Sequence, residues 1–217
     1  MTLLVKICGL STPDTLDVAI EAGADMVGFV FFPRSPRNIS FEQARALGER
    51  VKDKARKVAL TVDADDPLLE KIVEALKPDM LQLHGHETPQ RVAAVRESFG
   101  LPVMKVLAIE AKADLLVIGS YTSVADRLLF DARPPREATR PGGLGKPFDW
   151  HLLENLNLSI PFMLSGGLHA DNVAEALRVT RAPGVDVSSG VESAPGVKDP
   201  EKIRAFIRAA RSAKVPA

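Results

Sequence analysis

LLVKICGLSTPDTLDVAIEAGADMVGFVF, residues 3–31, contains two apolar runs on either side of an amphipathic stretch. The runs, 3–8 and 25–31, are short and rich in Leu, Val, Ile and Phe, which is typical of buried strands. The stretch between them, 12–22, has a helical pattern, with Pro13 at a first-turn position where proline is tolerated. A strand, a helix and a second strand at this spacing predict two parallel strands joined by a crossover helix.

The same alternation continues along the chain, with a period of about 25 residues. The apolar runs that we predict as strands are 3–8, 25–31, 57–62, 79–84, 102–107, 127–132, 161–166 and 184–189. The amphipathic stretches that we predict as helices are 12–22, 40–51, 66–76, 88–99, 111–119, 148–156, 170–179 and 199–211. Eight strand–helix units in 217 residues predict an α/β fold, a single-domain (β/α)8 TIM barrel over residues 1–217. A doubly wound open sheet is the alternative, but eight regular units favour the closed barrel.

The composition indicates a globular protein of the cell interior. Hydrophobic residues make up 46% of the chain, and the formal net charge is zero. A zero net charge gives no support to nucleic-acid binding, which usually needs a basic excess. A single cysteine cannot form an internal disulfide, and no apolar run approaches the ~20 residues that span a bilayer. We therefore expect a cytoplasmic protein with neither a nucleic-acid nor a membrane partner.

Polar side chains interrupt several predicted strands. Side chains alternate along a strand, so the odd residues of 3–8 form one apolar face and Lys6 and Cys8 share the other. The same alternation predicts inward side chains at Gln82, His84, Lys105 and Asp131. Catalytic groups of this fold come from the C-terminal ends of different strands, so these residues predict an active site there. The alternative is that Lys6 and Lys105 are structural charges with internal partners.

Glycine-containing turns follow the last two predicted strands. The loops after the seventh and eighth strands of such barrels often bind phosphate, because backbone N–H groups there can approach an anion closely. We expect the segment GVESAPG, 190–196, to form the short helix that often accompanies such a site. The predicted phosphate-binding residues are Gly166, Gly167, Ser188, Ser189 and Gly190. Ordinary turn glycines are the alternative.

Loop 132–147 is the one long irregular connection. Its PGGLG segment, 141–145, lacks the complete P-loop pattern, which favours a mobile lid over the barrel mouth. His84, His86 and Glu87 are close in sequence, but their spacing is not that of HExxH and no cysteine cluster accompanies them. We therefore expect no metal ion.

Two further features concern the predicted barrel mouth. Arg34 and Arg37 lie in FFPRSPRNIS, 31–40, and could bind a carboxylate or phosphate bidentately. A solvated loop is the alternative for both arginines. Cys8 could act as a nucleophile with a histidine base, but the sequence places no histidine beside it, so an acid–base role is favoured.

Seven segments spread along the chain form a recognisable set. In order they are KICGL, GFVFFPRSPRNIS, LQLHG, LLFDA, GGLGKPFDW, SGGLHADNVAEAL and GVDVSSGVESAPGVKDPEKIRAF. Together they resemble the phosphoribosylanthranilate isomerases, a family of tryptophan-biosynthesis enzymes, from the first strand to the last helix. Two residues depart from the family pattern: Leu144, where a small hydroxylic residue is usual, and His86, where an acidic residue is common.

The resemblance implies an Amadori rearrangement of N-(5-phosphoribosyl)anthranilate to 1-(2-carboxyphenylamino)-1-deoxyribulose 5-phosphate, without a cofactor or a metal ion. It implies that Cys8 is the general base, Asp131 the general acid, and that Arg37 holds the anthranilate carboxylate. A thiol is weakly ionised at neutral pH, and Lys6 on the same strand face would favour the Cys8 thiolate. The expected substrate-binding residues are Lys6, Arg37, Gln82, His84, Gly143 and Gly145.

The resemblance also implies a partner and an assembly: a phosphorylated small-molecule substrate, bound by a monomer or a homodimer. Two other functions stay open from the residues. One is another phosphosugar isomerase or epimerase on the same barrel, which would not need a pocket for an aromatic carboxylate. The other is a phosphometabolite-binding protein without catalysis, which would leave the pairing of Cys8 with Asp131 unexplained.

Overall fold

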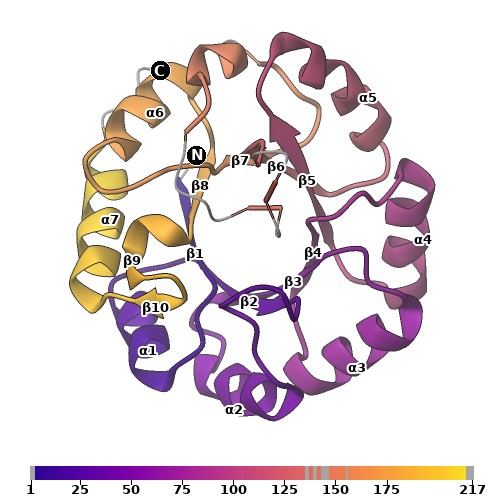
Figure 1. Cartoon of the computed structure of the whole chain (residues 1–217), viewed down its shortest axis with the longest axis vertical. Coiled ribbons are helices and arrows are strands. Elements are labelled where there is room, and N and C mark those ends of the chain that lie inside the picture. Colours follow the sequence, from indigo (N-terminus) through magenta and orange to yellow (C-terminus); the bar gives the residue numbers. More distant parts are fainter. Residues whose placement is uncertain (1–2, 135–136, 139–140, 143–146, 155, 214–217) are drawn as a thin grey trace.

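Eight parallel strands close into a barrel, which confirms the predicted fold (Figure 1). The computed structural model describes residues 3–134, 137–138, 141–142, 147–154 and 156–213. Neighbouring strands pair in chain order, and the first pairs with the last to close the barrel. The strands are β1 (Leu4–Cys8), β2 (Met26–Phe31), β3 (Arg56–Thr61), β4 (Met80–Leu83), β5 (Val103–Ile109), β6 (Arg127–Ala132), β7 (Phe162–Leu164) and β8 (Gly184–Val187).

An outer layer of helices surrounds the barrel (Figure 1). The α-helices are α1 (Pro13–Glu21), α2 (Phe41–Val51), α3 (Asp66–Leu76), α4 (Pro89–Phe99), α5 (Ile118–Tyr121), α6 (Val173–Thr180) and α7 (Pro200–Ser212). Local sequence explains where several of them begin. The Asp65 side chain accepts the Leu68 N–H at the start of α3, and Thr88 caps α4 in the same way, each followed by a proline in the first turn.

The fifth and sixth units differ from the predicted helices. In the fifth, predicted over 111–119, a 3-10 helix, η1 (Lys112–Val117), precedes the short α5. In the sixth, predicted over 148–156, the described residues form a single 3-10 turn, η2 (Trp150–Leu153). The backbone at Glu154 is extended, with φ −61° and ψ 130°, and this conformation ends the helix after one turn. The periodicity of hydrophobic residues therefore predicts the position of this element but not its type.

Side chains that point into the barrel form two layers. The lower layer is apolar and consists of Met26, Val58, Met80, Met104, Val106, Leu129 and Met163. Above it, toward the C-terminal ends of the strands, Cys8 packs with Val30 and Leu60. The lower layer fills the barrel as a packed core, so the polar site lies above it.

The segment after β8 folds back on itself. A 3-10 helix, η3 (Ser189–Val191), leads into the antiparallel pair β9 (Glu192–Ala194) and β10 (Val197–Lys198). The predicted short helix over 190–196 is therefore wrong for most of that segment. Gly196 has φ 85°, and a Cβ there would lie 2.6 Å from a carbonyl oxygen of the loop after β2, so the turn between β9 and β10 needs glycine.

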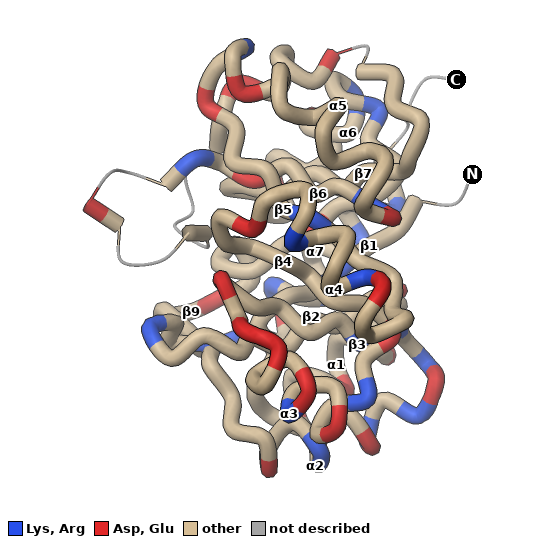
Figure 2. Tube along the Cα trace, turned by 90° about the vertical axis from the view of Figure 1, so that its right-hand side faces the viewer, with Lys and Arg blue, Asp and Glu red and all other residues tan. Residues whose placement is uncertain are grey.

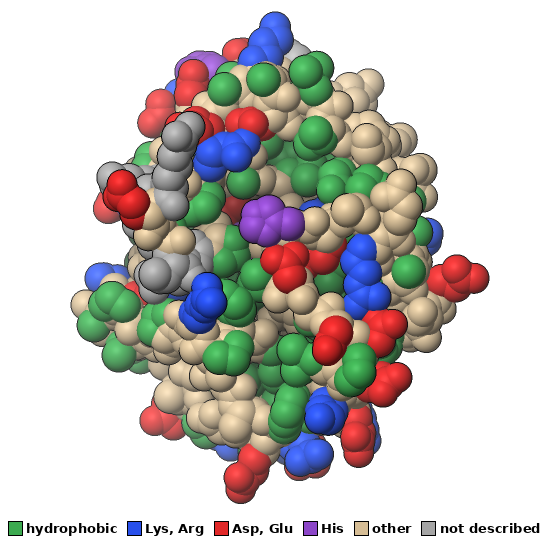
Figure 3. All heavy atoms as spheres, turned by 45° about the vertical axis from the view of Figure 1, so that its right-hand side comes forward, with side chains coloured by type: hydrophobic (Ala, Val, Ile, Leu, Met, Phe, Trp, Pro, Cys, Tyr) green, Lys and Arg blue, Asp and Glu red, His purple; other side chains and the backbone are tan. Residues whose placement is uncertain are grey.

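Charges of both signs are interspersed over the molecule. Figure 2 shows both Lys or Arg and Asp or Glu spread over the trace, in keeping with the net charge of zero. From the side on which α3, α4 and α5 lie, small groups of exposed hydrophobic side chains are separated by charged ones (Figure 3). None of the described helices is long and apolar enough to cross a membrane.

Candidate active site

A cavity lies at the C-terminal end of the barrel. Its walls include most of the site residues predicted from the sequence: Cys8, Arg37, Gln82, His84, Asp131, Gly166, Gly167, Ser188, Ser189 and Gly190. They come from β1, β4 and β6 and from the loops that follow β2, β4, β7 and β8. Part of the wall is apolar and includes Val30, Phe32, Leu60, Val62 and Leu168. The cavity therefore offers both charged groups and a hydrophobic surface to one bound molecule.

Lys6 and Cys8 share the inward face of β1, as predicted. Lys6 is fully buried, and its Nζ donates to Oδ1 of Asp186 on β8 at 2.8 Å. The register of β1 and β2 places Gly28 opposite Cys8. A Cβ on Gly28 would lie 2.9 Å from the Cys8 Sγ and 3.0 Å from the Lys6 Nζ. The thiol and the ammonium therefore fit side by side because β2 has no side chain at this point.

Burial decides the protonation of Cys8. It raises the pKa of the thiol, and the positive charge of Lys6 offsets that effect only in part. For Lys6, burial acts to lower the pKa, but Asp186 and Cys8 act in the opposite direction and the pKa is raised overall. Lys6 thus acts on Cys8 in the predicted direction, but the structure favours the thiol over the expected thiolate.

Asp131 lies beside His84 at the mouth of the barrel. The His84 Nε2 is 3.4 Å from the Asp131 Oδ2, and the two side chains are 12% and 8% exposed. Glycines leave room for the carboxyl group: a Cβ on Gly142 would lie 2.6 Å from Oδ2, and one on Gly166 would lie 3.2 Å from Oδ1. Asp131 is on β6, which β7 and β8 separate from Cys8 on β1, so the two groups line the cavity from different strands.

Arg37 is held by a buried carboxylate. Its Nε donates to Glu192 Oε1 at 2.6 Å, and its Nη2 donates to Oε2 at 2.8 Å. Its Cδ would lie 2.5 Å from a Cβ on Gly9, so the loop after β1 packs directly against the arginine. Because Glu192 uses this edge of the guanidinium, binding of the anthranilate carboxylate by Arg37 stays a prediction.

Lys198 joins this cluster and connects it to the loop after β8. Its Nζ donates to Glu192 Oε1 at 2.7 Å and to the Ser188 carbonyl oxygen at 2.8 Å. Burial acts to raise the pKa of Glu192, but Arg37 and Lys198 outweigh it and the pKa is lowered. Burial lowers the pKa of Lys198 to about 8, although Glu192 acts to raise it. Lys198 therefore changes its charge in the weakly alkaline range.

The predicted phosphate turns lie next to that cluster. Gly166 and Gly167 have φ values of 85° and 68°, in the region that favours glycine. A Cβ on Gly190 would lie 1.9 Å from the Leu168 carbonyl oxygen, which no side chain can approach so closely. The backbone itself thus requires these glycines, and phosphate binding by the turns stays a prediction.

Gln82 presents a buried amide group to the cavity. It is fully buried on β4, and neither its amide oxygen nor its amide nitrogen has a hydrogen-bond partner among the described residues. An unpaired buried polar group costs about 1–3 kcal/mol. Because Gln82 also lines the cavity, a polar group of a bound molecule would relieve this cost, which supports its predicted role in substrate binding.

Lys105 does not point into the barrel, and that prediction is wrong. The register of β4 and β5 pairs Lys105 with Leu83, which packs in the core between the strands and the helices. The inward positions of β5 belong to Met104 and Val106 instead. Lys105 binds Glu87 outside the barrel interior, at 2.7 Å. Its neighbours in β5 are apolar on both faces, so polarity alone does not reveal which face is inward.

Other predicted features lie outside the cavity or outside the described residues. Gly143, Leu144 and Gly145 are not among the residues that the structure describes. The His86 side chain is 95% exposed, with its Nδ1 3.2 Å from Asp63 Oδ2. Within the described part of the chain, no group of three or more His, Cys, Asp or Glu side chains could hold a metal ion.

Several residues of the site are not predicted from the sequence. Asp186 and Ser165 line the cavity, and Ser165 Oγ donates to Asp186 at 3.3 Å. The alternation of side chains in β7 and β8 would have placed both inward. Gly28 and Glu192 carry no local signal, because their roles depend on contacts with residues distant in the chain.

Known proteins of one family match this chain along almost its whole length. The family model for N-(5'phosphoribosyl)anthranilate (PRA) isomerase matches residues 5–209. An N-(5'-phosphoribosyl)anthranilate isomerase from Bradyrhizobium diazoefficiens is 68% identical over 212 residues, covering 98% of this chain and 95% of that protein. One from Rhodopseudomonas palustris (strain BisB18) is 65% identical over 214 residues, covering 99% of this chain and 98% of that protein.

Solved structures agree with the sequence matches. The phosphoribosyl anthranilate isomerase of Thermotoga maritima superposes with a TM-score of 0.87 at 33% identity, covering 97% of this chain and 99% of that chain. A second solved isomerase, in complex with reduced 1-(o-carboxyphenylamino)-1-deoxyribulose 5-phosphate, superposes with a TM-score of 0.82 at 30% identity, with coverage of 97% and 99%. This chain therefore belongs to the family of N-(5'-phosphoribosyl)anthranilate isomerases, as its resemblance to them predicts.

Proposed function

We propose that this isomerase of tryptophan biosynthesis acts by general acid–base catalysis, with Asp131 as the acid and Cys8 as the base. Its substrate is N-(5-phosphoribosyl)anthranilate and its product 1-(2-carboxyphenylamino)-1-deoxyribulose 5-phosphate. The observation that carries the proposal is that both groups line one cavity from different strands. The rearrangement needs one group that gives a proton to the ribose ring oxygen and another that removes the proton at C2′.

Ring opening is the first step. Asp131 donates its proton to the ring oxygen while the bond from C1′ to that oxygen breaks. The anthranilate nitrogen supplies its lone pair and forms an iminium at C1′. His84 lies 3.4 Å from Asp131 Oδ2, so it is placed to contact the carboxyl group during the transfer.

Proton removal from C2′ is the second step. The Cys8 thiolate takes the proton, and the electrons of the C2′–H bond form the double bond of an enolamine while the iminium is neutralised. The enolamine then tautomerises to the ketone, as C1′ gains a proton and the C2′ hydroxyl loses one. Because burial raises the pKa of Cys8, the opposing charge of Lys6 is what this step requires. The positive iminium adds to the effect of Lys6 while it exists.

The walls of the cavity suit the parts of this substrate. The phosphate fits the turns after β7 and β8, close to Lys198, and the aromatic ring fits the apolar wall that includes Phe32 and Leu60. Gln82 is placed to bind a sugar hydroxyl. A relative solved in complex with reduced 1-(o-carboxyphenylamino)-1-deoxyribulose 5-phosphate supports a ligand of this kind.

We also propose that the protein is cytoplasmic and a monomer or homodimer. The solved structure of monomers generated from the dimeric isomerase of Thermotoga maritima, at 31% identity and a TM-score of 0.81, shows that a relative is a dimer. Light scattering after size exclusion measures the state of this chain. A larger assembly would contradict the proposal.

Turnover of phosphoribosylanthranilate, followed by the loss of its fluorescence, tests the function. Cys8→Ser offers a group far harder to ionise, and Asp131→Asn has no carboxyl proton to give. Each should lose about 10²-fold or more in kcat, since a general acid or base typically contributes about 10²–10⁴-fold. Asp53→Asn, before β3 at the opposite end of the barrel, is the matched control and should keep its kcat. A folded Cys8→Ser or Asp131→Asn variant with normal kcat overturns the assignment of that residue.

A further inference from the structure

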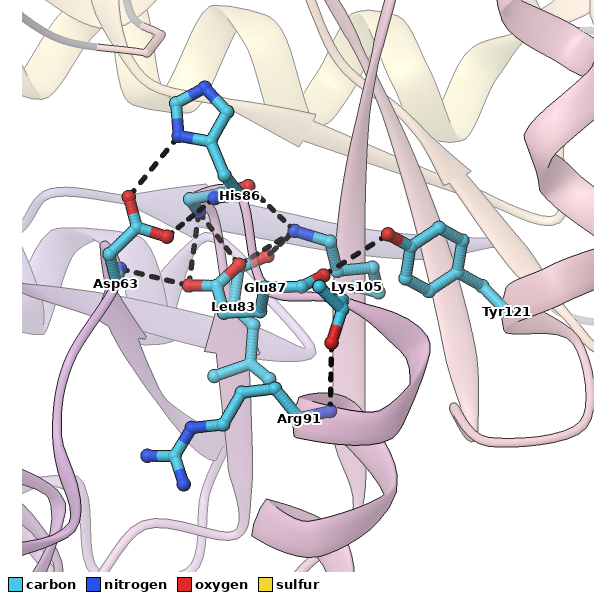
Figure 4. A network of polar contacts seen from close by, with 9 residues as sticks. Asp63, Leu83, His86, Glu87, Arg91, Lys105 and Tyr121 are labelled. Carbon is cyan, nitrogen blue, oxygen red and sulfur yellow. Dashed lines mark hydrogen bonds and ion pairs between the residues drawn. The ribbon is translucent and has the colours of Figure 1, made fainter.

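A second set of buried charges lies outside the barrel interior, under the loop after β4 (Figure 4). The side chains of Lys105 and Glu87 are 3% and 2% exposed, and Lys105 Nζ lies 2.7 Å from Glu87 Oε2. The proposed acid–base steps use neither residue. Removing two charges from water costs several kcal/mol for each ion, so further hydrogen bonds must compensate.

The further hydrogen bonds of Lys105 go to the backbone on both sides of His84. The Nζ donates to the carbonyl oxygen of Gly85 at 2.8 Å and to that of Leu83 at 3.4 Å. The N–H of His84 itself donates to the Thr61 carbonyl oxygen at 2.9 Å. The backbone around His84 is therefore held from the two neighbouring strands, β3 and β5.

Glu87 holds the same loop from its own side. Its Oε2 accepts the N–H of Gly85 at 2.9 Å, and its Oε1 accepts the N–H of Asp63 at 2.9 Å. Asp63 accepts the N–H of His86 at 2.5 Å, so the loops after β3 and β4 are tied together, as Figure 4 shows. From α5, the Tyr121 hydroxyl donates to the Glu87 carbonyl oxygen at 3.1 Å.

His84 connects this network to the cavity. Its Nε2 is 3.4 Å from Asp131 Oδ2, whereas Lys105 and Glu87 are not among the residues that line the cavity. We propose that the buried ion pair is a positioning pair: it acts through the loop backbone and holds the His84 imidazole against the Asp131 carboxyl group. The inference rests on the proposed function, in which Asp131 donates the proton to the ring oxygen.

The pair affects turnover more than substrate binding. A misplacement of about 1 Å at a catalytic group can cost about 10²-fold in rate. The turns that suit the phosphate follow β7 and β8, whereas the Lys105 ammonium bonds to Leu83, Gly85 and Glu87, on β4 and the loop after it. Loss of the pair therefore lowers kcat and leaves KM for the substrate nearly unchanged.

Lys105→Met removes the ammonium and keeps a side chain of similar length. We expect kcat to fall about 10–100-fold and KM for phosphoribosylanthranilate to change less than about threefold. Lys71→Met, at an exposed position of α3, is the matched control and should leave both constants unchanged. If the unpaired Glu87 prevents Lys105→Met from folding, Lys105→Met/Glu87→Gln removes both charges and should show the same loss of kcat. A normal kcat in either folded variant overturns the inference.

A double-mutant cycle with His84→Ala shows whether the pair acts through His84. Adding Lys105→Met to His84→Ala should change kcat by less than about twofold, because the group that the pair positions is already absent. Losses that multiply would show that Lys105 acts by another route, and would overturn the inference. Asp131→Asn separates the two possible failures. Normal kcat in that variant overturns the proposed acid, whereas a low kcat there with normal kcat in Lys105→Met overturns the positioning pair alone.

Discussion

Two buried lysines of this protein bind carboxylates at nearly the same distance but on opposite sides of the barrel wall. Inside, Lys6 Nζ lies 2.8 Å from Asp186; outside, Lys105 Nζ lies 2.7 Å from Glu87. The inner ammonium lies against the Cys8 thiol and acts on its pKa, while the outer one also donates to backbone carbonyl groups. The role of each pair therefore depends on the other groups that its ammonium contacts. The inner pair shifts the pKa of a thiol, and the outer pair holds the backbone of a loop.

Both pairs are buried, so the loss of one partner should affect stability similarly in each. Removing one partner of a buried pair typically costs about 3–5 kcal/mol of stability, because an uncompensated charge stays buried. We therefore expect the single substitutions Lys6→Met and Lys105→Met to reduce the free energy of unfolding by similar amounts. Their effects on catalysis are where the two regions should differ.

The largest expected effect is that of Lys6→Met on turnover. It removes the largest charge effect that opposes burial at Cys8, so kcat should fall by about 10²–10³-fold, more than in Lys105→Met. Steady-state kinetics measure kcat, and urea unfolding confirms that both variants fold. If Lys105→Met loses more kcat than Lys6→Met, the two pairs do not divide the roles as we describe.

Glycines beside the two pairs provide the next test. A Cβ on Gly28 would lie 3.0 Å from Lys6 Nζ, and one on Gly85 would lie 2.2 Å from Asp63 Oδ1 in the outer network. Gly28→Ala should lower kcat about 10–100-fold by displacing the thiol and ammonium. Gly85→Ala should lower stability by about 1–3 kcal/mol, and it should also lower kcat because it displaces the loop backbone that holds His84.

The matched control for both glycine variants is Gly119→Ala, in α5. A Cβ there would meet nothing within 4 Å, so kcat should be unchanged and stability should rise by up to about 1 kcal/mol. Kinetics and urea unfolding measure the three variants together. Equal losses of kcat in Gly28→Ala and Gly119→Ala would contradict a steric effect at the thiol.

The pH dependence of Cys8 alkylation distinguishes the two lysines directly. The thiolate is the form that reacts, and burial raises the pKa of the Cys8 thiol. The alkylation rate should therefore rise about tenfold per pH unit and level off only above about 8.5, the usual pKa of a cysteine thiol. Lys6→Met should move the midpoint further upward, because the opposing positive charge is lost. Lys105→Met should leave it unchanged. Iodoacetamide labels only this site, since Cys8 is the single cysteine; a midpoint below 8.5 would contradict the raised pKa.

The third buried lysine, Lys198, should give the smallest effect. Burial lowers its pKa to about 8, so its positive charge is present below that pH and lost above it. Sulfate keeps its charge in this range, so its competitive inhibition should weaken about threefold between pH 7 and 9. Lys198→Gln should remove this dependence, while Lys105→Met should retain it. Inhibition that is independent of pH in the parent protein would place the anion away from Lys198.

Repetition in the sequence explains why the barrel could be predicted. Each apolar run must be buried as a strand of a sheet, and each amphipathic helix must pack its apolar face against that sheet. Eight such units in a row are compatible with few architectures. Whether a short segment forms an α-helix or a 3-10 turn is harder to predict, because few residues determine it. At 148–156 the pattern of a helix is present, but the structure has one 3-10 turn in its described residues, because the backbone turns extended at Glu154.

The sequence by itself determined the barrel and the inward faces of β1, β4 and β6, because side chains alternate along every strand. Only the tertiary structure decided that Lys105 faces outward, since apolar neighbours on both faces hide the register that β4 imposes. It also decided the partners of Lys6 and Arg37, which lie 180 and 155 residues away in the chain. The raised pKa of the Cys8 thiol is also a result of the tertiary structure, because desolvation depends on every atom packed around the thiol rather than on any sequence neighbour.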